Sequence, residues 1–188
     1  MAHVAMWDKL KEQAKGLQQQ AQGARGGGPA RPGGPGGGSG GGSRAQLVGA
    51  LKSQLTSLKA ELKSGAFRDA SMAVCALVAA ADGHVDPAER QHVESLIVSN
   101  DVLQNFPAGQ LRERFNRHVD QLAANFAHGK AQALQEIAKA AKKPVEARAV
   151  VQTGLVVAGA DGYVAPAEEQ VLREACAALG LSPTEFGL

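Results

Sequence analysis

Two acidic segments of nearly the same sequence occur in this chain. The first reads VAAADGHVDPAE over residues 78–89, and the second reads VAGADGYVAPAE over residues 157–168. Each contains the pattern D-G-x-V-x-x-x-E, so Asp82 and Glu89 of the first segment correspond to Asp161 and Glu168 of the second. Carboxylate oxygens are the ligands that hard divalent cations prefer. The pattern therefore raises the hypothesis of a metal site.

The spacing within each segment matches the second half of an EF-hand loop, which has Gly at position 6 and Glu at position 12. The first half does not match, because positions 1 and 3 would be Val78 and Ala80, or Val157 and Gly159. Calcium takes six to eight oxygen ligands, and half a loop supplies too few. Neither segment alone is therefore predicted to bind calcium.

A shared site is a different hypothesis, because a fold that brings the two segments together would bring four carboxylates together. The predicted metal ligands are Asp82, Glu89, Asp161 and Glu168. The sequence does not distinguish Ca²⁺, Mg²⁺, Mn²⁺ and Zn²⁺ as the divalent cation. Like charges at short range are unfavourable unless a cation or a basic group lies between them. Asp86 and Glu169 lie beside the four and are candidates for contact with a partner.

The alternative is that these acidic residues only cap helices. Asp86-Pro-Ala-Glu89 reads as an N-cap followed by a capping box, and Glu168 in a first helical turn suits the helix dipole. The second segment has Ala165, a poor N-cap, in place of Asp86. Capping thus explains Asp86 and explains the repeated Glu less well. A protein-interaction scaffold with purely structural acidic caps remains the alternative function.

Catalytic motifs are not found in the sequence. A Ser–His–Asp order, a P-loop and an H-E-x-x-H motif are all missing. Glu89-x-x-His92 resembles half of a di-iron motif, but Val171 stands where the second segment would need the matching His. A metal-dependent hydrolase that uses the carboxylates with His84 or His92 is the weakest hypothesis. We predict that the protein is not an enzyme.

The segments are positioned by consecutive helices. Residues 67–82 and 145–160 are apolar on nearly every face and are predicted to be buried helices. Each is followed by a tight turn and an amphipathic helix that begins with Pro, over 87–100 and 166–179. Further apolar stripes are predicted over 47–62, ended by Gly65, over 111–126, and over 130–143. The predicted fold is all-α: a compact bundle of about seven helices with a pseudo-two-fold duplication.

Three regions are predicted along the chain. Residues 23–44 contain twelve Gly and three Pro and are predicted to be a disordered linker. They separate a short amphipathic helix over 1–22 from the helical domain over 45–188. In the first region Trp7 lies on the apolar side and Lys11 on the polar side, which suits an anionic membrane, a partner or the chain's own domain.

The charge and composition of the chain indicate its expected location in the cell and the partners that are not expected. The net charge is +2, with +4 in residues 1–44 and −2 in the remainder, so nucleic-acid binding is not expected. No apolar run reaches the length of a membrane span. Cys75 and Cys176 are predicted to be buried, reduced thiols. We expect a cytoplasmic protein that associates peripherally with the inner face of the cell membrane.

The chain resembles the TerB family of tellurite resistance and stress-response proteins. The resemblance is carried by the paired ADG turns with their following Glu, by MAVCALVAAADG over 72–83, and by LGLSPTEFGL over 179–188. It covers roughly residues 45–188, and MWDKLKEQAKGL over 6–17 is similar to the family's start. The Gly/Pro-rich insert departs from the family pattern.

The resemblance implies an all-helical domain without a known catalytic activity. It also implies association with a TerC-like integral membrane protein, within a metal-sensing or stress-signalling complex. In the family the acidic residues of the two turns are the suspected ligand or interaction surface. These correspond here to Asp82, Glu89, Asp161 and Glu168.

Overall fold

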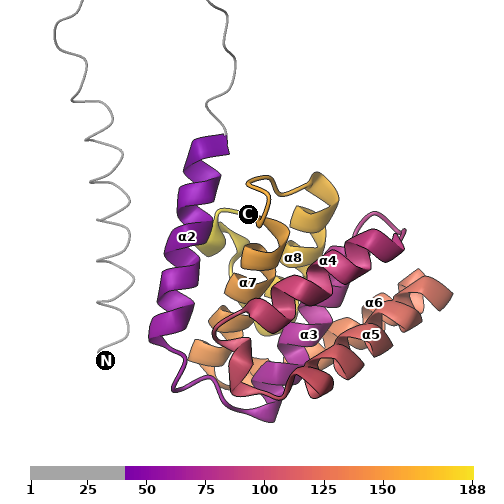
Figure 1. Ribbon diagram of the computed structural model, residues 1–188, viewed down its shortest axis with the longest axis horizontal. Coiled ribbons are helices and arrows are strands. Elements are labelled where there is room, and N and C mark those ends of the chain that lie inside the picture. Colours follow the sequence, from indigo (N-terminus) through magenta and orange to yellow (C-terminus); the bar gives the residue numbers. More distant parts are fainter. Residues whose placement is uncertain (1–40) are drawn as a thin grey trace, which may run out of the picture. The chain divides into compact units, whose positions relative to one another are not determined.

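The computed structural model describes residues 41–188, with side chains from Gln46 onward. This part of the chain folds into seven α-helices, three short 3-10 helices and no strand, as the all-α prediction requires (Figure 1). The α-helices are α2 (Gly41–Ser57), α3 (Gly65–Ala79), α4 (Pro87–Ser99), α5 (Ala108–Ala124), α6 (Phe126–Ala138), α7 (Pro144–Ala158) and α8 (Pro166–Leu179). The 3-10 helices are η1 (Leu103–Asn105), η2 (Lys139–Lys142) and η3 (Pro183–Phe186).

The two apolar helices form the centre of this domain. Helix α3 packs against α5, α6, α7 and α8, and it is buried from Ala70 to Ala79 without interruption. Helix α7 packs against α2, α3 and α8 and is buried along most of its length. A helix with apolar side chains on every face needs neighbours on every face. The prediction of two buried helices is therefore confirmed.

Helices α3 and α7 approach each other closely at Gly154. A Cβ atom at this position would lie 2.8 Å from Leu172 Cδ2 and 3.0 Å from Val74 Cγ2. Both of those side chains are fully buried, so neither has free space to move into. The missing side chain of Gly154 thus permits the packing of α3, α7 and α8.

Two predicted helix boundaries are wrong. The stripe over 47–62 does not continue to Gly65, because α2 ends at Ser57 and Gly65 is the first residue of α3. Ser64 caps α3 by accepting a hydrogen bond from the Phe67 amide at 3.1 Å. Leu62 lies beyond the end of α2 and is also apolar and buried. The apolar periodicity therefore continues across the break and does not reveal it.

The stripe over 111–126 also crosses a break. Helix α5 ends at Ala124, and Asn125 caps α6 by accepting a hydrogen bond from the His128 amide at 3.1 Å. Phe126 therefore begins α6 instead of completing the stripe of α5, and α6 starts four residues before the predicted position 130. At the close approach of these two helices, a Cβ on Gly129 would lie 2.7 Å from the Leu122 amide nitrogen.

Helix α2 begins at Gly41, within the range predicted as linker, and packs along α7. Val48 contacts the end of α7, where a Cβ on Gly159 would lie 2.6 Å from Val48 Cγ2. Gln152 of α7 donates a hydrogen bond from Nε2 to Gln54 Oε1 at 3.3 Å. The predicted amphipathic helix over 1–22 and most of the predicted linker lie outside the described residues.

We expect Gly154→Val to destabilise the domain, because the added side chain must displace buried atoms of Val74 and Leu172. Overpacking of this kind costs about 2 kcal/mol of unfolding free energy. Thermal and urea unfolding measure the loss. Gly109→Val is the matched control, since a Cβ at Gly109 of α5 meets no atom within 4 Å. Equal midpoints for the two variants would contradict the close packing.

We expect stability to fall as the pH is lowered below about 6.5, because of His118 on α5. Its side chain is buried and its Nδ1 has no hydrogen-bond partner among the described residues. Burial, and next the charge of Arg117, lower the pKa of His118 from its ordinary value of 6.5. The unfolded chain therefore binds the proton first as pH falls, which favours unfolding.

Urea unfolding at pH 7.5 and 5.5 tests this expectation. His118→Leu removes the titrating group while keeping an apolar side chain, so this variant should lose less stability between the two pH values than the wild type. The other titrating groups are the same in both proteins. A parallel loss in wild type and variant would show that His118 does not contribute to the pH dependence.

Candidate functional site

The two acidic turns have the same backbone structure. Gly83 and Gly162 both adopt a φ of 85°, a left-handed conformation that favours glycine. Asp82 Oδ1 accepts a hydrogen bond from the His84 amide at 2.9 Å, and Asp161 Oδ1 accepts one from the Tyr163 amide at 3.0 Å. These bonds close an Asx turn after α3 and after α7. The sequence repeat is therefore also a structural repeat.

The helices that follow the turns start differently. At α4, Asp86 is the N-cap and accepts a hydrogen bond from the Ala88 amide at 2.8 Å. At α8, the N-cap is Ala165, which has no side-chain acceptor, and Glu168 Oε2 instead accepts from the Ala165 amide at 2.8 Å. Glu89 accepts no hydrogen bond from the described residues, unlike its counterpart Glu168. The capping explanation thus holds for Asp86 and Glu168 and does not account for Glu89.

The acidic residues of the two turns influence one another across the repeat. Partial burial raises the pKa of Glu168, which the charges of Asp161, Glu89 and Asp82 raise further against the opposing hydrogen bond from Ala165. Partial burial also raises the pKa of Glu89, followed by the charges of Asp82 and Asp86. Glu168 of the second turn is therefore close enough for two carboxylates of the first turn to repel its ionised form.

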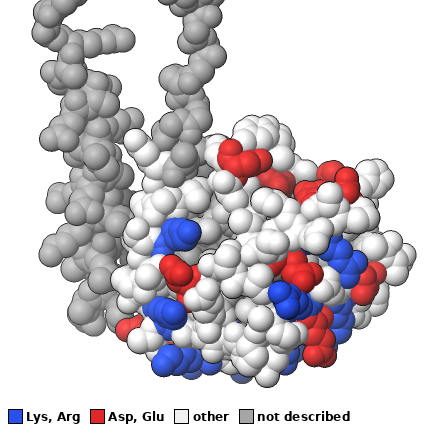
Figure 2. Space-filling view, in the orientation of Figure 1, with Lys and Arg blue, Asp and Glu red and all other residues white. Residues whose placement is uncertain are grey.

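We call this surface the acidic edge and define it as Asp82, Asp86, Glu89, Asp161 and Glu168. Figure 2 shows acidic side chains along the upper border of the domain, where α4 and α8 begin, and the lysines and arginines of this view lie lower. Two helix N-termini add partial positive charge beside these carboxylates. That partial charge offsets some of the repulsion among them.

The acidic edge is not a ready-made metal site. Within residues 41–188, no group of three or more His, Cys, Asp or Glu side chains is arranged to hold a metal ion. Asp82, Asp161 and Glu168 each use a carboxylate oxygen for a hydrogen bond to a nearby backbone amide. As they lie in the structure, the predicted ligands do not fit the coordination shell of a divalent cation.

The remaining predicted site residues differ in their surroundings. Asp86 is exposed, whereas Glu169 is only partly exposed and lies 3.6 Å from Arg173, one turn later on α8. His84 and His92 are exposed, and Val171, the counterpart of His92, is buried in the core. Trp7 and Lys11 lie outside the described residues.

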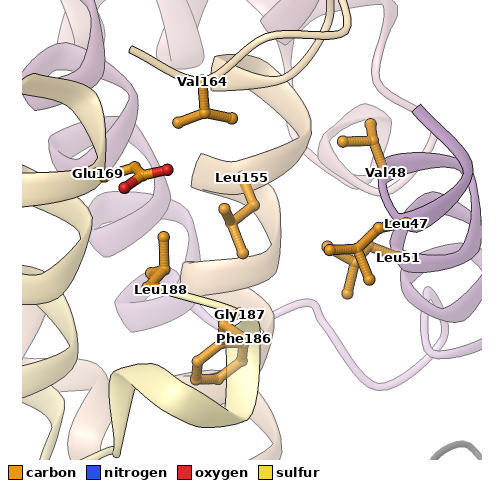
Figure 3. A pocket seen from close by; sticks show the side chains of 9 residues that line it. All are labelled: Leu47, Val48, Leu51, Leu155, Val164, Glu169, Phe186, Gly187 and Leu188. Carbon is orange, nitrogen blue, oxygen red and sulfur yellow. The ribbon is translucent and has the colours of Figure 1, made fainter. Parts of the chain in front are cut away.

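Sequence reasoning missed an apolar hollow beside the second turn. Leu47 and Val48 of α2, Val164 of the turn and Phe186 of η3 are among the residues that line it (Figure 3). These residues come from three separate parts of the chain, so no local pattern marks them as neighbours. The signal in the sequence is weak: α2 carries Leu47 and Val48 in succession, which widens its apolar face.

Comparison with known proteins gives one family. Residues 68–188 match the family model described as tellurite resistance protein TerB. No curated protein and no solved structure gives a significant match. Among the described residues, no helix is both long enough and apolar enough to cross a membrane.

We expect Glu89→Gln to stabilise the protein slightly at pH 7, by up to about 0.5 kcal/mol, as is usual for surface substitutions. The pKa of Glu89 is raised in the folded protein, so folding disfavours the ionised side chain, and stability is lost as pH rises through that pKa. Destabilisation by Glu89→Gln in thermal unfolding would refute the repulsion.

The corresponding change at Glu168 tests its hydrogen bond. Glu168→Gln keeps an acceptor for the Ala165 amide, and Glu168→Ala removes it. Of these two variants, we expect only Glu168→Ala to lower the thermal midpoint.

Proposed function

The chain belongs to the TerB family of tellurite resistance proteins, and we propose that it acts as a non-catalytic binding module through its acidic edge. Cationic groups are the ligands that such an edge attracts, either a divalent metal ion or basic side chains of a partner. The observation that carries the proposal is the repeated acidic turn, in which Asp82 and Asp161 hold the same Asx turn after α3 and after α7. The charges of Asp82 and Glu89 contribute to the raised pKa of Glu168, which places the two turns near each other. Carboxylates that repel one another in the free protein are relieved by a bound cation.

Glu89 is the residue of the acidic edge that most directly supports this proposal. Its carboxylate is ionisable, exposed and without a hydrogen bond from the described residues, and it repels Asp82 and Asp86. A side chain kept only for stability would be expected to cap the helix, as Glu168 does on α8. Partial burial, Asp82 and Asp86 disfavour the ionised form of Glu89, and the charge of His92 opposes them. Both oxygens of the Glu89 carboxylate therefore remain available to a ligand.

A divalent cation would draw its ligands from both turns: Asp82, Glu89, Asp161 and Glu168. Asp82 and Asp161 each retain one oxygen that their Asx turns do not use. Because the four side chains do not converge on one point, binding requires rotation of Glu89 and Glu168 toward the aspartates. We infer a site of modest affinity that responds to metal concentration and joins the α3–α4 and α7–α8 units.

The partner in this proposal is a TerC-like integral membrane protein that presents Lys or Arg to the same edge. Asp86 and Glu169 flank the four carboxylates and extend the surface toward the starts of α4 and α8. Basic side chains need no fixed coordination geometry, so this arrangement suits them without rearrangement. The protein would then lie at the inner face of the membrane and take part in a stress response there.

The alternative proposal is a scaffold whose acidic residues serve only as caps. The hydrogen bonds of Asp86 and Glu168 to the backbone amides favour it. This alternative predicts that neutralising the carboxylates of the acidic edge changes the binding of neither a metal ion nor a partner.

We expect Mg²⁺, Ca²⁺, Mn²⁺ or Zn²⁺ to release heat on titration into the full chain and to raise its thermal midpoint. Binding to the folded state alone stabilises by a logarithm of the ligand concentration. Asp82→Asn/Asp161→Asn should abolish both effects while keeping the Asx turns, because the amide oxygen of Asn accepts the same backbone hydrogen bond.

The matched control is Glu61→Gln/Asp101→Asn, which makes the same change in net charge on exposed side chains. Asn105 of η1 donates hydrogen bonds to the carbonyls of Lys59 and Leu62, which places the control residues at the end of α4 away from the acidic edge. Equal heats from the two double variants would rule out the metal.

The same two double variants also test whether the acidic edge binds the partner. Wild type and control should bind reconstituted vesicles that carry the TerC-like protein, with affinity that falls at high salt. Loss of binding in Asp82→Asn/Asp161→Asn without any metal response would leave the partner as the ligand. Unchanged metal response and unchanged partner capture would establish the scaffold.

A further inference from the structure

The duplication repeats basic residues as well as acidic ones. Asp82 and Asp161 are separated by 79 residues. The same interval separates Lys63, which precedes α3, from Lys142, which precedes α7. Each copy of the repeat therefore runs from a lysine, through a buried helix, to an acidic turn.

The two lysines lie at the same end of the domain. The 3-10 helix η2 packs against both α3 and α7, so the segments that lead into these helices are neighbours. The connection between α2 and α3 lies at the lower border of the domain in Figure 1, and lysine and arginine side chains lie along that border in Figure 2. We call this surface the basic end and define it by its lysines, which are Lys59, Lys63, Lys139, Lys142 and Lys143.

The basic end has an excess of positive charge. Lys139 pairs with Glu136 at 2.9 Å, and Lys143 lies 3.7 Å from Glu146. Glu61 lies in the same segment as Lys59 and Lys63, so five lysines face three carboxylates and the net charge is +2. Lys63 and Lys142 are exposed, and neither forms an ion pair with another described residue. These two lysines are therefore available to a partner.

The basic end and the acidic edge lie too far apart to neutralise each other within one molecule. They are at opposite ends of α3 and α7, which have 15 residues each and are therefore about 22 Å long. Charges in water are screened over about 8 Å at physiological ionic strength. The dipoles of the two helices add partial positive charge at the basic end and partial negative charge at the acidic turns. Each surface thus presents its charge to other molecules.

We propose that the basic end binds the acidic edge of a second copy of this chain, so that copies associate head to tail. Lys63 and Lys142 of one copy would lie opposite Asp82 and Asp161 of the next. The inference rests on the proposed function, since it takes the acidic edge as a surface that attracts basic side chains, and it names a partner for that edge.

Two properties of the domain favour this partner. The acidic edge carries five carboxylates, which supply the charge opposite to that of the basic end. The lysine pair and the aspartate pair both belong to α3 and α7, so the packing of the same two helices sets the spacing of both pairs. Nucleic acids and anionic membranes, in contrast, are repelled by a domain whose residues 45–188 carry −2. A small acidic surface therefore suits the basic end better than a polyanion.

The two surfaces in this contact are different, so the contact does not close on itself. Each copy that docks through its acidic edge leaves its own basic end open to a further copy. A contact of this kind generates an open series instead of a symmetric dimer. This property separates head-to-tail association from other modes of self-association in an experiment.

Sedimentation of the full chain tests the proposal. At low salt the mean mass should rise with protein concentration, and at about 1 M salt, where the screening length is about 3 Å, the protein should be monomeric. Lys63→Gln/Lys142→Gln and Asp82→Asn/Asp161→Asn should each be monomeric at low salt. A mixture of these two variants should form a dimer and nothing larger, because each variant keeps the surface that the other lacks.

The matched control is Lys52→Gln/Arg117→Gln. It removes two positive charges from exposed side chains inside α2 and α5, and it should associate as the wild type does. Circular dichroism should show equal helicity in all the proteins. A wild type that stays monomeric at low salt would overturn the proposal, as would a mixture that forms no dimer.

Two other results assign the contact to different groups. Association that survives Lys63→Gln/Lys142→Gln and is lost in Asp82→Asn/Asp161→Asn would mean that basic residues of 1–44 bind the acidic edge of another copy. Wild type that binds vesicles of anionic phospholipid through Lys63 and Lys142 without self-association would assign the basic end to the membrane. Each of these results would overturn head-to-tail association.

Failure of this inference is distinguishable from failure of the proposed function. Lys63→Gln/Lys142→Gln leaves every carboxylate of the acidic edge in place, so it should keep the metal response and the binding to the TerC-like protein. Those two properties in a wild type that does not self-associate would overturn the head-to-tail contact alone. Loss of all three in the wild type would overturn the binding role of the acidic edge as well.

Discussion

The arrangement of this domain depends on the close approach of α3 and α7. The contact lies at Val74 and Gly154, five residues before the end of α3 and four before the end of α7. Because each helix leads directly into an acidic turn, a contact so near both C-terminal ends keeps the two turns close. The packing of two apolar helices thus decides where the five carboxylates of the acidic edge lie, although none of these acidic residues takes part in that packing.

The acidic edge combines interactions of opposite sign. Backbone amides and two helix N-termini stabilise Asp82, Asp86, Asp161 and Glu168. Mutual repulsion and partial burial act against ionisation of Glu89 and Glu168. The local bonds hold the turns in place, and the repulsion that remains is the free energy that a cationic ligand can relieve. The acidic edge is in this way fixed locally by hydrogen bonds while its carboxylates still repel one another.

The second turn lies between two surfaces of different character. Asp161 and Glu168 belong to the acidic edge, while Val164 and Glu169 line the apolar hollow beside α2. The first turn lacks this second role, because Val85 is only partly buried and no counterpart of α2 is described there. The two copies of the duplicated unit have therefore diverged: Glu89 of the first accepts no hydrogen bond from the described residues, and Val164 of the second lines the apolar hollow.

The sequence by itself determined the all-helical class, the two buried helices, the glycine turns and the Pro-initiated helices α4 and α8, because each follows from local periodicity or backbone conformation. It did not determine the ends of α2 and α5, where apolar side chains continue through a turn. Only the tertiary structure decided that the carboxylates lie along an edge without converging, and that Leu47, Val164 and Phe186 share one hollow. Such neighbours are distant in the chain and are brought together by packing, which leaves no periodic trace in the sequence.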